Sequence, residues 1–499
     1  MIADRPNSES PRIGIIGAGP AGLTAAFQLG KAGVPAITWE ADHEYVGGIS
    51  RTVVYKGYRF DIGGHRFYSK SKEVEDLWRE ILPDDNDFLL RQRLSRIYFK
   101  GQFYSYPLDL AEVVHQLGKR QSALTLGSYL KARLFTFSTP RNLEDWVTLK
   151  FGRRLYRMFF KSYTEKVWGM PCSEISADWA AQRIKGLSLS RAALHALRPR
   201  REAPPGAAAG RQQEIKTLIT AFRYPRLGPG MLWEAAAEKT VRHGGVIQMG
   251  ARVVSLERRP GPGWRVGLEQ QGRASQVDVE HLICSAPLGW LVRTIQPRLP
   301  ADVLAAAGSL QYRDFITVAL IVRPQVSFKD NWIYIHDPDL KVGRIQNFAN
   351  WSPEMVPEPG TACYGMEYFT SQSEAFWHRS DGDLIALASR ELEVLGLVRS
   401  GDVLDAAVVR QPRAYPVYDD AYRTRRELIR HALLVDCPNL HVVGRNGLHQ
   451  YNNQDHSMMT AILAVRNILA GRTLYDLWQV NQDAEYLESD SPPASSQPG

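Results

Sequence analysis

A glycine-rich turn close to the start of the chain constrains the fold more than any other feature. Residues 13–16 form an uninterrupted apolar run, and Gly17, Gly19 and Gly22 follow in the spacing G-x-G-x-x-G. The first glycine permits a tight turn, the second lets the backbone approach a pyrophosphate, and the third lets the next helix pack closely on the strand. The pattern therefore predicts a strand, a turn and a helix that together hold a dinucleotide.

The residues that follow the glycines strengthen this prediction because they come in the required order. Pro20 and Ala21 open the helix, whose unpaired N–H groups and positive dipole end favour phosphates. Glu40 ends the next apolar run about twenty residues later, where a carboxylate can accept hydrogen bonds from ribose hydroxyls. An incidental glycine-rich turn would explain the glycines but not the order of strand, turn, helix, strand and acid.

Other short segments favour FAD as the dinucleotide. No second G-x-G-x-x-G follows a predicted strand, which disfavours reductases that bind FAD and NAD(P)H in separate domains. Gly47, Gly48 and Arg51 belong to a second glycine turn that can approach the pyrophosphate. Val253 lies on a predicted strand whose backbone can meet the adenine edge, and Ala286 lies in the turn after another apolar strand.

Length and charge bound the organisation of the chain. At 499 residues it is too long for one simple core, so two or three subdomains are expected. The net charge of +8 is concentrated in residues 183–226, where ten Arg or Lys oppose two acidic residues. Within this stretch, residues 198–214 are predicted to be a basic loop. The loop is either a solvated surface or a guide for anionic substrates or an anionic membrane surface; no nucleic-acid-binding motif accompanies it.

The cysteines and the N-terminus favour a cytoplasmic protein. The four cysteines lie far apart without a C-x-x-C pair, which argues against a disulfide scaffold, a zinc site and an iron–sulfur cluster. The N-terminus lacks a basic region followed by an apolar signal core, and no apolar run reaches membrane-spanning length. We therefore expect a soluble cytoplasmic protein without a bound metal.

The order of the predicted elements divides the chain into a cofactor domain and two insertions. Three separate segments are expected to build the FAD-binding domain, namely residues 1–105, 215–300 and 425–480. Residues 106–214 are predicted to form a helical insertion, and residues 301–424 a sheet that forms the substrate domain. The Ser/Pro-rich residues 485–499 are expected to be a disordered tail.

Several motifs carry a resemblance to a known group of flavoproteins. They lie at residues 60–67 (FDIGGHRF), 163–168 (YTEKVW), 176–179 (SADW), 222–225 (FRYP), 414–417 (AYPV) and 444–457 (GRNG to YNNQDHS). With these motifs the chain resembles the FAD-dependent amine oxidase/protoporphyrinogen oxidase-like superfamily, and within it the UDP-galactopyranose mutase family. The resemblance implies an α/β fold: a Rossmann-like (GR2-type) FAD-binding domain of discontinuous segments, a helical insertion and an antiparallel-sheet substrate domain.

The resemblance also assigns roles to four candidate catalytic residues. It implies that His65 lies against the flavin ring near N5, and that Arg445 bridges the flavin and a substrate diphosphate with Tyr451 beside it. Arg344 resembles the second diphosphate-binding arginine of the mutases. The chemistry of arginine supports the two diphosphate-binding roles. A guanidinium group binds phosphate oxygens in a bidentate fork, and two guanidinium groups can neutralise a departing diphosphate.

The same resemblance extends the set of flavin-binding residues. Asn453 and Gln454 would open a helix that covers the isoalloxazine, and this helix start adds N–H donors toward the electron-rich end of a reduced flavin. Gly64 and His65, together with Gly444 and Arg445, complete the candidate cofactor-binding residues.

Structural alternatives stay open for several of these residues. His65 can satisfy local backbone groups, Arg344 can be a surface strand residue, and Arg445 can be purely structural. The remaining candidates for pocket or framework are Trp168, Trp179, Tyr163, Glu367 and Tyr368. Arg66 departs from the mutase pattern, which has an apolar residue there, and its charge would alter the flavin potential or bind a carboxylate or phosphate of a different substrate.

Two functions of different classes follow from these features. The first is a flavin-dependent mutase that interconverts the pyranose and furanose forms of a nucleotide-diphosphate sugar through a flavin N5–sugar adduct, for cell-surface polysaccharide or glycoconjugate biosynthesis. It would use reduced FAD, with NAD(P)H as an external reductant. The alternative is an FAD-dependent oxidoreductase of the amine oxidase or desaturase type. A non-catalytic flavin-binding partner protein is the third possibility, and the oligomeric state is left open.

Overall fold

The computed structural model describes residues 13–106, 108, 110–135, 139–177, 221–261 and 263–481. The predicted basic loop at 198–214, the predicted tail at 485–499 and Trp179 lie outside these residues. None of the helices in the described ranges combines the length and the apolar character that crossing a membrane requires.

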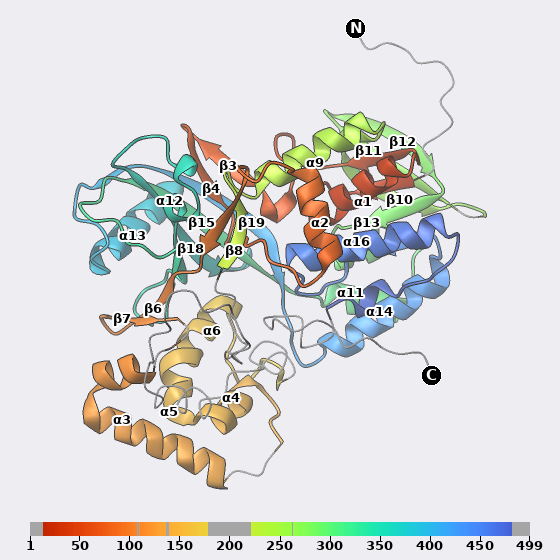
Figure 1. Cartoon of the computed structure of the whole chain (residues 1–499). Helices are drawn as coiled ribbons and strands as arrows, with labels where there is room; N and C mark the ends of the chain where they lie inside the picture. Colours follow the sequence, from red (N-terminus) through yellow and green to blue (C-terminus); the bar gives the residue numbers. More distant parts are fainter. Residues whose placement is uncertain are drawn as a thin grey trace, which may run out of the picture.

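A parallel sheet forms the centre of one half of the molecule (Figure 1). Its strands lie in the order β20-β13-β1-β2-β9, and every neighbouring pair is parallel. The strands are β1 (Ile13–Ile16), β2 (Ala36–Trp39), β9 (Val246–Gln248), β13 (His281–Cys284) and β20 (Leu440–Val442). Their order along the chain reverses at β1, and ligands of such sheets bind at the carboxyl ends of the strands beside this switch point.

Helices pack against the parallel sheet. α1 (Pro20–Lys31) follows β1 directly and packs on α9 (Gly230–Arg242) and α16 (Gln454–Leu469). Small side chains such as Ala25 and Ala26 are fully buried in the core between α1, α16 and the strands. The predicted helix start near Gln454 is therefore confirmed, and it brings the far end of the chain onto the first βα unit.

A second, smaller sheet lies next to the parallel sheet. Its strands have the order β12-β11-β10-β14. They are β10 (Arg252–Arg258), β11 (Trp264–Gln270), β12 (Arg273–Val279) and β14 (Ile295–Gln296). One hydrophobic core joins this sheet to nearby helices. These helices are α10 (Leu288–Thr294), α11 (Ala301–Gly308) and α14 (Tyr422–Asp436).

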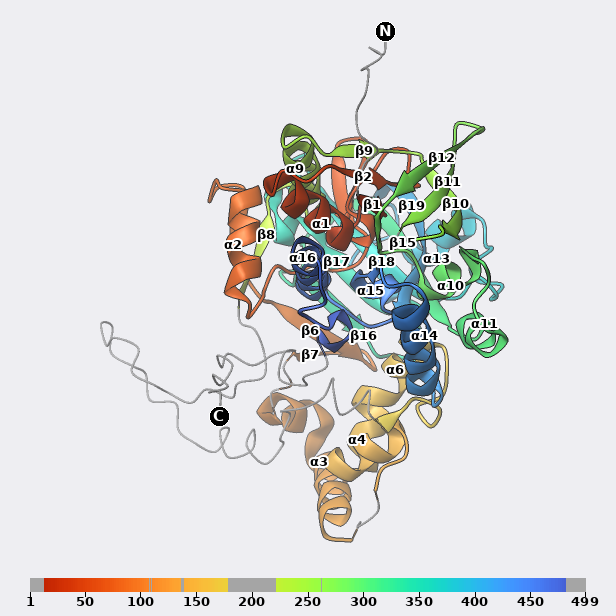
Figure 2. The same cartoon turned by 90° about the vertical axis from the view of Figure 1, so that its right-hand side faces the viewer.

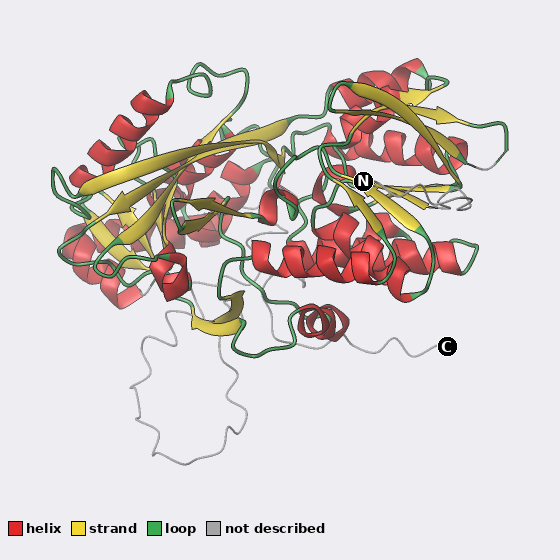
Figure 3. Cartoon of the chain, turned by 90° about the horizontal axis from the view of Figure 1, so that it is seen from above, coloured by secondary structure: helices red, strands yellow, loops and turns green. Residues whose placement is uncertain are grey.

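A large sheet forms the other half of the molecule, and Figure 3 shows the two halves side by side. Its order is β19-β15-β18-β17-β16-β6-β7, with all pairs antiparallel except β16–β6. The strands are β6 (Ser95–Phe99), β7 (Gln102–Ser105), β15 (Tyr312–Val322), β16 (Trp332–Ile335), β17 (Arg344–Asn347), β18 (Ala362–Thr370) and β19 (Val403–Pro416). α12 (Phe348–Trp351) follows β17, and α13 (Asp381–Val394) packs on β15 and β19.

The strand pairing differs from the predicted domain boundaries at one place. Residues 1–105 were assigned to the cofactor domain, but β6 and β7 at the end of this segment belong to the large sheet. The reason is long-range pairing, because Ser95 of β6 lies opposite Trp332 of β16. The other predicted boundaries stay predictions.

Helices of the insertion form a block below the large sheet (Figure 2). They are α3 (Leu110–Phe135), α4 (Leu143–Phe151), α5 (Arg153–Tyr156) and α6 (Ser162–Trp168). α3 is kinked at Gly118 (φ +72°), and the break between α4 and α5 falls at Gly152 (φ +82°). The helical character of residues 106–177 is thus as expected, but glycines with positive φ divide it.

Short paired strands and one helix connect the two halves. β3 (Thr52–Tyr55) pairs with β4 (Tyr58–Asp61), and β5 (Phe88–Gln92) pairs with β8 (Ala221–Pro225). α2 (Lys72–Ile81) packs on α9 and α16. The loop that carries His65 leaves β4 between these elements.

Candidate functional site

The first glycine turn has the shape that a pyrophosphate site requires. Gly17 adopts φ +94°, and a Cβ on Gly22 would lie 1.8 Å from the Gly17 carbonyl oxygen, so α1 can approach β1 only with glycine at position 22. Gly19 is different, because a Cβ there would make only an ordinary contact of 3.8 Å with Gly48 Cα. Protein packing therefore does not require glycine at position 19, whereas a closely bound ligand would.

The second glycine turn abuts the first. The Gly47 N–H donates to the Ala18 carbonyl oxygen at 2.8 Å, and Gly47 adopts φ +93°. Arg51 Nη1 donates to the Gly48 carbonyl oxygen at 2.9 Å, which fixes the guanidinium beside this turn. The two turns thus form one cradle at the end of β1, and the residues present fit the pyrophosphate of a dinucleotide.

Glu40 lies beside this cradle at the end of β2. Its carboxylate accepts hydrogen bonds from the Ala18 N–H at 2.6 Å and the Asp42 N–H at 2.9 Å. Burial raises the pKa of Glu40 despite these bonds. Val253 is two residues beyond Ala251, whose N–H donates to the Glu40 carbonyl oxygen. The predicted ribose and adenine contacts are therefore neighbours.

Gly444 and the turn after β13 lie next to the first glycine turn. Gly444 has φ +79°, and a Cβ on it would lie 3.1 Å from Ala21 Cβ and 3.8 Å from Ser285 Cβ. Ser285 donates through its Oγ to the Ile16 carbonyl oxygen at 2.8 Å, which places the neighbouring Ala286 at the same edge. The cofactor-binding residues predicted from distant segments are thus together at the switch point.

A pair of alanine substitutions tests this cradle. We expect Gly19→Ala to fold normally but to retain about tenfold less flavin, because its methyl group would occupy the space of the pyrophosphate. Gly22→Ala is expected to prevent stable folding, because its Cβ would overlap the Gly17 carbonyl oxygen. The flavin-to-protein absorbance ratio and the thermal melting curve measure both effects. Full flavin content in Gly19→Ala would contradict the proposed position of the pyrophosphate.

The N-terminus of α16 meets the loop that carries His65. Asn453 caps the helix in a reciprocal capping box with His456. Gln454 Nε2 donates to the Arg66 carbonyl oxygen at 3.1 Å. The first turn of a sixteen-residue helix therefore faces the His65 loop with its positive dipole end, as predicted for the flavin ring site.

His65 is held as a neutral imidazole in this loop. Its Nδ1 is 3.1 Å from the Gly63 carbonyl oxygen, which can only accept, so Nδ1 carries the proton. Burial, together with the charges of Arg445 and Arg344, lowers the pKa of His65 to about 3. Nε2 is therefore an unprotonated acceptor across the physiological pH range.

Arg344 points inward from the large sheet and not to solvent. Strand register places it directly opposite Glu367, and its Nε and Nη2 lie 2.8 and 2.5 Å from Glu367 Oε2. The Glu367 side chain is fully buried, and Gln346 Nε2 donates to its other oxygen. Burial is the largest influence and lowers the pKa of Arg344, but Glu367, Tyr415 and Tyr163 together raise it by more, so the net pKa lies well above the ordinary value. A Cβ on Gly63 would lie 3.8 Å from Arg344 Nη2 and 3.7 Å from His65 Cε1, so both side chains border the same glycine.

Arg445 comes from the segment that follows β20 of the parallel sheet, whereas Arg344 comes from the large sheet. Its Nε donates to the Asn452 carbonyl oxygen at 2.8 Å and its Nη1 to the Ala414 carbonyl oxygen at 3.0 Å. The guanidinium lies over Tyr415 and Tyr451, at 5.3 and 5.0 Å from their ring centroids. The two rings stack on each other at 5.5 Å and 10°. Burial is the main cause that raises the pKa of Tyr415 to about 12, so the Tyr415 ring is neutral at physiological pH.

Aromatic rings continue the site toward the helical block. Tyr163 of α6 stacks on His336 at 4.7 Å and meets Tyr334 edge-on at 5.5 Å. Lys166 anchors α6, because its Nζ donates to the carbonyl oxygens of Ile335, Asp337 and Val342 at 3.0 Å each. Trp168 instead belongs to the hydrophobic core of the helical block. Tyr163, by contrast, is within electrostatic range of Arg344 and Glu367.

A second arginine cluster was not found from the sequence. The Arg93 guanidinium lies over Tyr106 at 5.1 Å and over Trp332 at 5.5 Å, and Arg66 lies over the same Trp332 at 5.5 Å. Arg93 Nε and Nη1 are buried and have no acceptor among the described residues. Arg66 was noted as a departure from the mutase pattern, but no local signal distinguishes Arg93. Tyr334 and Gln346 were also missed. Tyr334 is two residues from Trp332, and Gln346 is two residues from Arg344, so each shares a strand face with that residue.

The four predicted catalytic residues are thus brought together. His65, Arg344 and Arg445 interact electrostatically, and Tyr451 stacks beside Arg445. Glu367, which was open between pocket and framework, belongs to the site as the partner of Arg344, whereas Tyr368 bonds to Glu391 on the other side of its strand. These roles in binding stay predictions.

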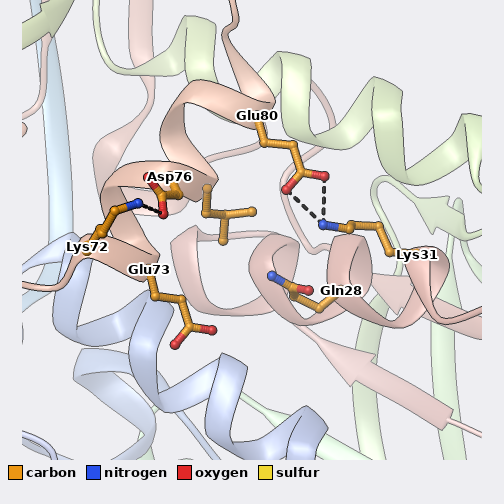
Figure 4. A pocket seen from close by; sticks show the side chains of 7 residues that line it. Gln28, Lys31, Lys72, Glu73, Asp76 and Glu80 are labelled. Atoms are coloured by element: carbon orange, nitrogen blue, oxygen red, sulfur yellow. Dashed lines mark hydrogen bonds and ion pairs between the residues drawn. The ribbon is translucent and has the colours of Figure 1, made fainter.

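A surface pocket elsewhere does not involve these residues. It lies between α1 and α2, and its lining comprises Gln28, Lys31, Lys72, Glu73, Asp76, Leu77 and Glu80 (Figure 4). Its charges are mutually satisfied: Lys31 pairs with Glu80 at 2.7 Å, Lys72 pairs with Asp76, and Glu73 pairs with Arg466. The pocket is therefore a solvated surface feature, separate from the cradle.

Comparisons with known proteins agree with this geometry. The family model of flavin containing amine oxidoreductases matches residues 20–446. The chain is similar to a crystal structure of a reduced UDP-galactopyranose mutase with a TM-score of 0.80 and 22% identity, over 95% of this chain and 98% of that one. This likeness shows the fold.

Relatives of known name match shorter parts of the chain. A dTDP-fucopyranose mutase of Escherichia coli is 28% identical over 169 residues, which are 33% of this chain and 43% of the relative. A ferredoxin–NADP reductase of Gluconacetobacter diazotrophicus is 32% identical over 103 residues, which are 21% of this chain and 30% of the relative. The matched region therefore spans less than half of each relative.

Proposed function

Because this chain belongs to the family of flavin containing amine oxidoreductases, we propose that it is a UDP-galactopyranose mutase-like isomerase that binds FAD. Its substrate would be a nucleotide-diphosphate sugar, whose pyranose and furanose forms it would interconvert. The observation that carries the proposal is that Arg344 of β17 and Arg445, three residues after β20, both lie near enough to the neutral His65 to lower its pKa. Oxidation of an amine needs no such pair of arginines.

The two arginines differ in how much charge they offer to a ligand. Arg344 is paired with the buried Glu367, so it contributes N–H donors with little net charge. Arg445 forms no ion pair with any described residue, and its hydrogen bonds go to the backbone carbonyl oxygens of Asn452 and Ala414. The Arg445 guanidinium therefore supplies the positive charge that a departing diphosphate needs, and Arg344 adds orientation.

The remaining residues would shape the sugar and flavin positions. Reduced FAD, when bound, supplies an electron-rich nitrogen that can act as a nucleophile toward the anomeric carbon. His65 would offer its unprotonated Nε2 as a hydrogen-bond acceptor to the bound group, and it takes up no proton at neutral pH. The stacked Tyr415 and Tyr451 rings exclude water from one side of Arg445, which strengthens its interaction with phosphate.

The proposal extends to the reductant and the setting. NAD(P)H would reduce the flavin from outside, because only one G-x-G-x-x-G follows a strand of the parallel sheet in the described residues. Isomerisation restores the flavin in each cycle, so the reductant is needed only for activation. We place this reaction in the biosynthesis of cell-surface polysaccharide or another glycoconjugate, in the cytoplasm where nucleotide sugars are used.

Chromatography of a nucleotide-sugar panel tests the function. The purified flavoprotein is reduced with dithionite or NADPH under nitrogen and incubated with UDP-galactopyranose, dTDP-fucopyranose and related compounds. We expect a new isomer of equal mass for at least one of them, and none with the oxidised protein. No conversion across the panel, together with oxygen consumption on an amine or lipid substrate, would establish the oxidoreductase alternative instead.

A further inference from the structure

The outer face of α3 exposes a stripe of leucines. Leu126, Leu130 and Leu134 are 57%, 47% and 62% exposed, and they lie four residues apart on one side of the helix. Ala123 precedes these leucines and Gly127 lies among them on the same side, and both are also exposed. Figures 1 and 2 both show the long part of α3 at the bottom of the helical block. A contiguous apolar face of this kind marks an interaction surface.

The opposite face of α3 already has its packing partners. Thr125 is buried, and Arg154 of α5 donates to Gln121. α3 also packs on α4 and β7. Before the kink at Gly118, α3 packs on the core of the helical block through Val113 and Leu117. After the kink Thr125 and Gln121 face the block, while Leu126, Leu130 and Leu134 are turned outward.

Positive charge surrounds the leucine stripe. Lys119 and Arg120 precede it, and Lys131 and Arg133 flank its far end. Residues 113–143 contain no Asp or Glu at all. None of these four cations forms an ion pair with a residue in the described part of the chain. The surface thus combines exposed leucines with uncompensated basic groups.

We propose that this face of α3 docks the protein on a membrane surface that contains anionic lipids. The leucines would enter the boundary between headgroups and acyl chains, while the long Lys and Arg side chains reach the phosphates. Anionic headgroups match the charge of the surface, and the helix would lie in the plane of the membrane without crossing it. This surface is separate from the cradle and from the proposed reaction.

A second copy of the chain fits the same face less well. A two-fold symmetric contact places identical patches against each other. The four cations of one α3 would then meet those of its copy, with no acidic residue in 113–143 to neutralise them. An anionic surface removes this repulsion, so the charge pattern favours lipid over self-association.

Vesicle flotation tests the proposal with the full flavoprotein. Vesicles of phosphatidylcholine alone are compared with vesicles containing phosphatidylglycerol, at about 0.1 M and at about 0.5 M salt. We expect binding to the anionic vesicles only, weakened at the higher salt. Leu126→Glu/Leu130→Glu should lower the bound fraction by about tenfold or more, because it places two carboxylates at the lipid boundary.

A matched variant and two further measurements make the test decisive. Leu90→Glu/Leu404→Glu carries the same two changes at exposed leucines of β5 and β19 and should bind like the wild type. Circular dichroism and flavin absorbance verify that both variants are folded. Absence of wild-type binding to anionic vesicles, or equal loss in both variants, would overturn the proposal. Light scattering measures the oligomeric state of the same proteins. A wild-type dimer that becomes a monomer only in Leu126→Glu/Leu130→Glu would assign the face to a second copy of the chain.

Discussion

Replacing Arg344 by Met is expected to lower the free energy of unfolding by about 3–5 kcal/mol, the usual consequence of leaving one partner of a buried ion pair alone. Glu367 is fully buried on β18, and Arg344 provides its opposite charge through two nitrogens. Gln346 alone would then have to stabilise the carboxylate, and one neutral amide donor cannot replace a guanidinium. Urea denaturation followed by circular dichroism measures this loss.

A second substitution separates the ion pair from the packing of the side chains. Arg344→Met/Glu367→Gln removes both charges and keeps the volumes close to the original, so it should recover most of the lost stability. The Gln346 amide can still hydrogen-bond to a glutamine at position 367. Equal instability of the single and the double variant would mean that Arg344 stabilises the sheet through packing and not through Glu367.

The local part of the cofactor site could be predicted from the sequence because neighbouring residues determine it. The glycine turn, α1, β2 and Glu40 follow one another in about thirty residues, and their order has one physical explanation. The strand at 281–284 and the helix start at Gln454 were found for the same reason: an apolar run and a polar cap define each end. No long-range information was needed for these elements.

Strand register explains what the sequence could not show. Arg344 was open between a surface residue and a site residue, because its inward direction depends on pairing with Glu367 of another strand. β6 was assigned to the wrong half because its partner, β16, lies far along the chain. Arg93 has no motif at all, and only the placement of Tyr106 and Trp332 around it reveals it.

A motif can also be recognised without its physical role. Asp61 belongs to the segment at 60–67 that supports the resemblance, but the sequence did not assign it a function. In the structure its carboxyl accepts hydrogen bonds from Tyr224 and Thr52, and burial raises its pKa to about 8. Asp61 therefore connects β4 to β8 and positions the loop of His65, which begins directly after it.

Replacing Arg445 by Lys is expected to weaken nucleotide-sugar binding by about a hundredfold, or about 3 kcal/mol, while FAD stays bound. The substitution keeps the charge but removes the planar fork. The guanidinium bonds to the Asn452 and Ala414 carbonyl oxygens through Nε and Nη1, so that Nη2 extends from a fixed plane. A lysine ammonium is a point charge on a flexible chain and cannot hold both carbonyls and a diphosphate at defined positions.

Calorimetric titration with UDP measures this loss, because UDP carries the diphosphate without the sugar. Arg410→Lys is the matched control: Arg410 belongs to β19 of the large sheet, and its partners are Asp381 and two backbone carbonyls. The control should bind UDP like the wild type. If Arg445→Lys also kept its affinity while its flavin content and melting curve were unchanged, the diphosphate would bind elsewhere. The cluster of Arg66 and Arg93 around Trp332 of the large sheet would then be the next site to substitute.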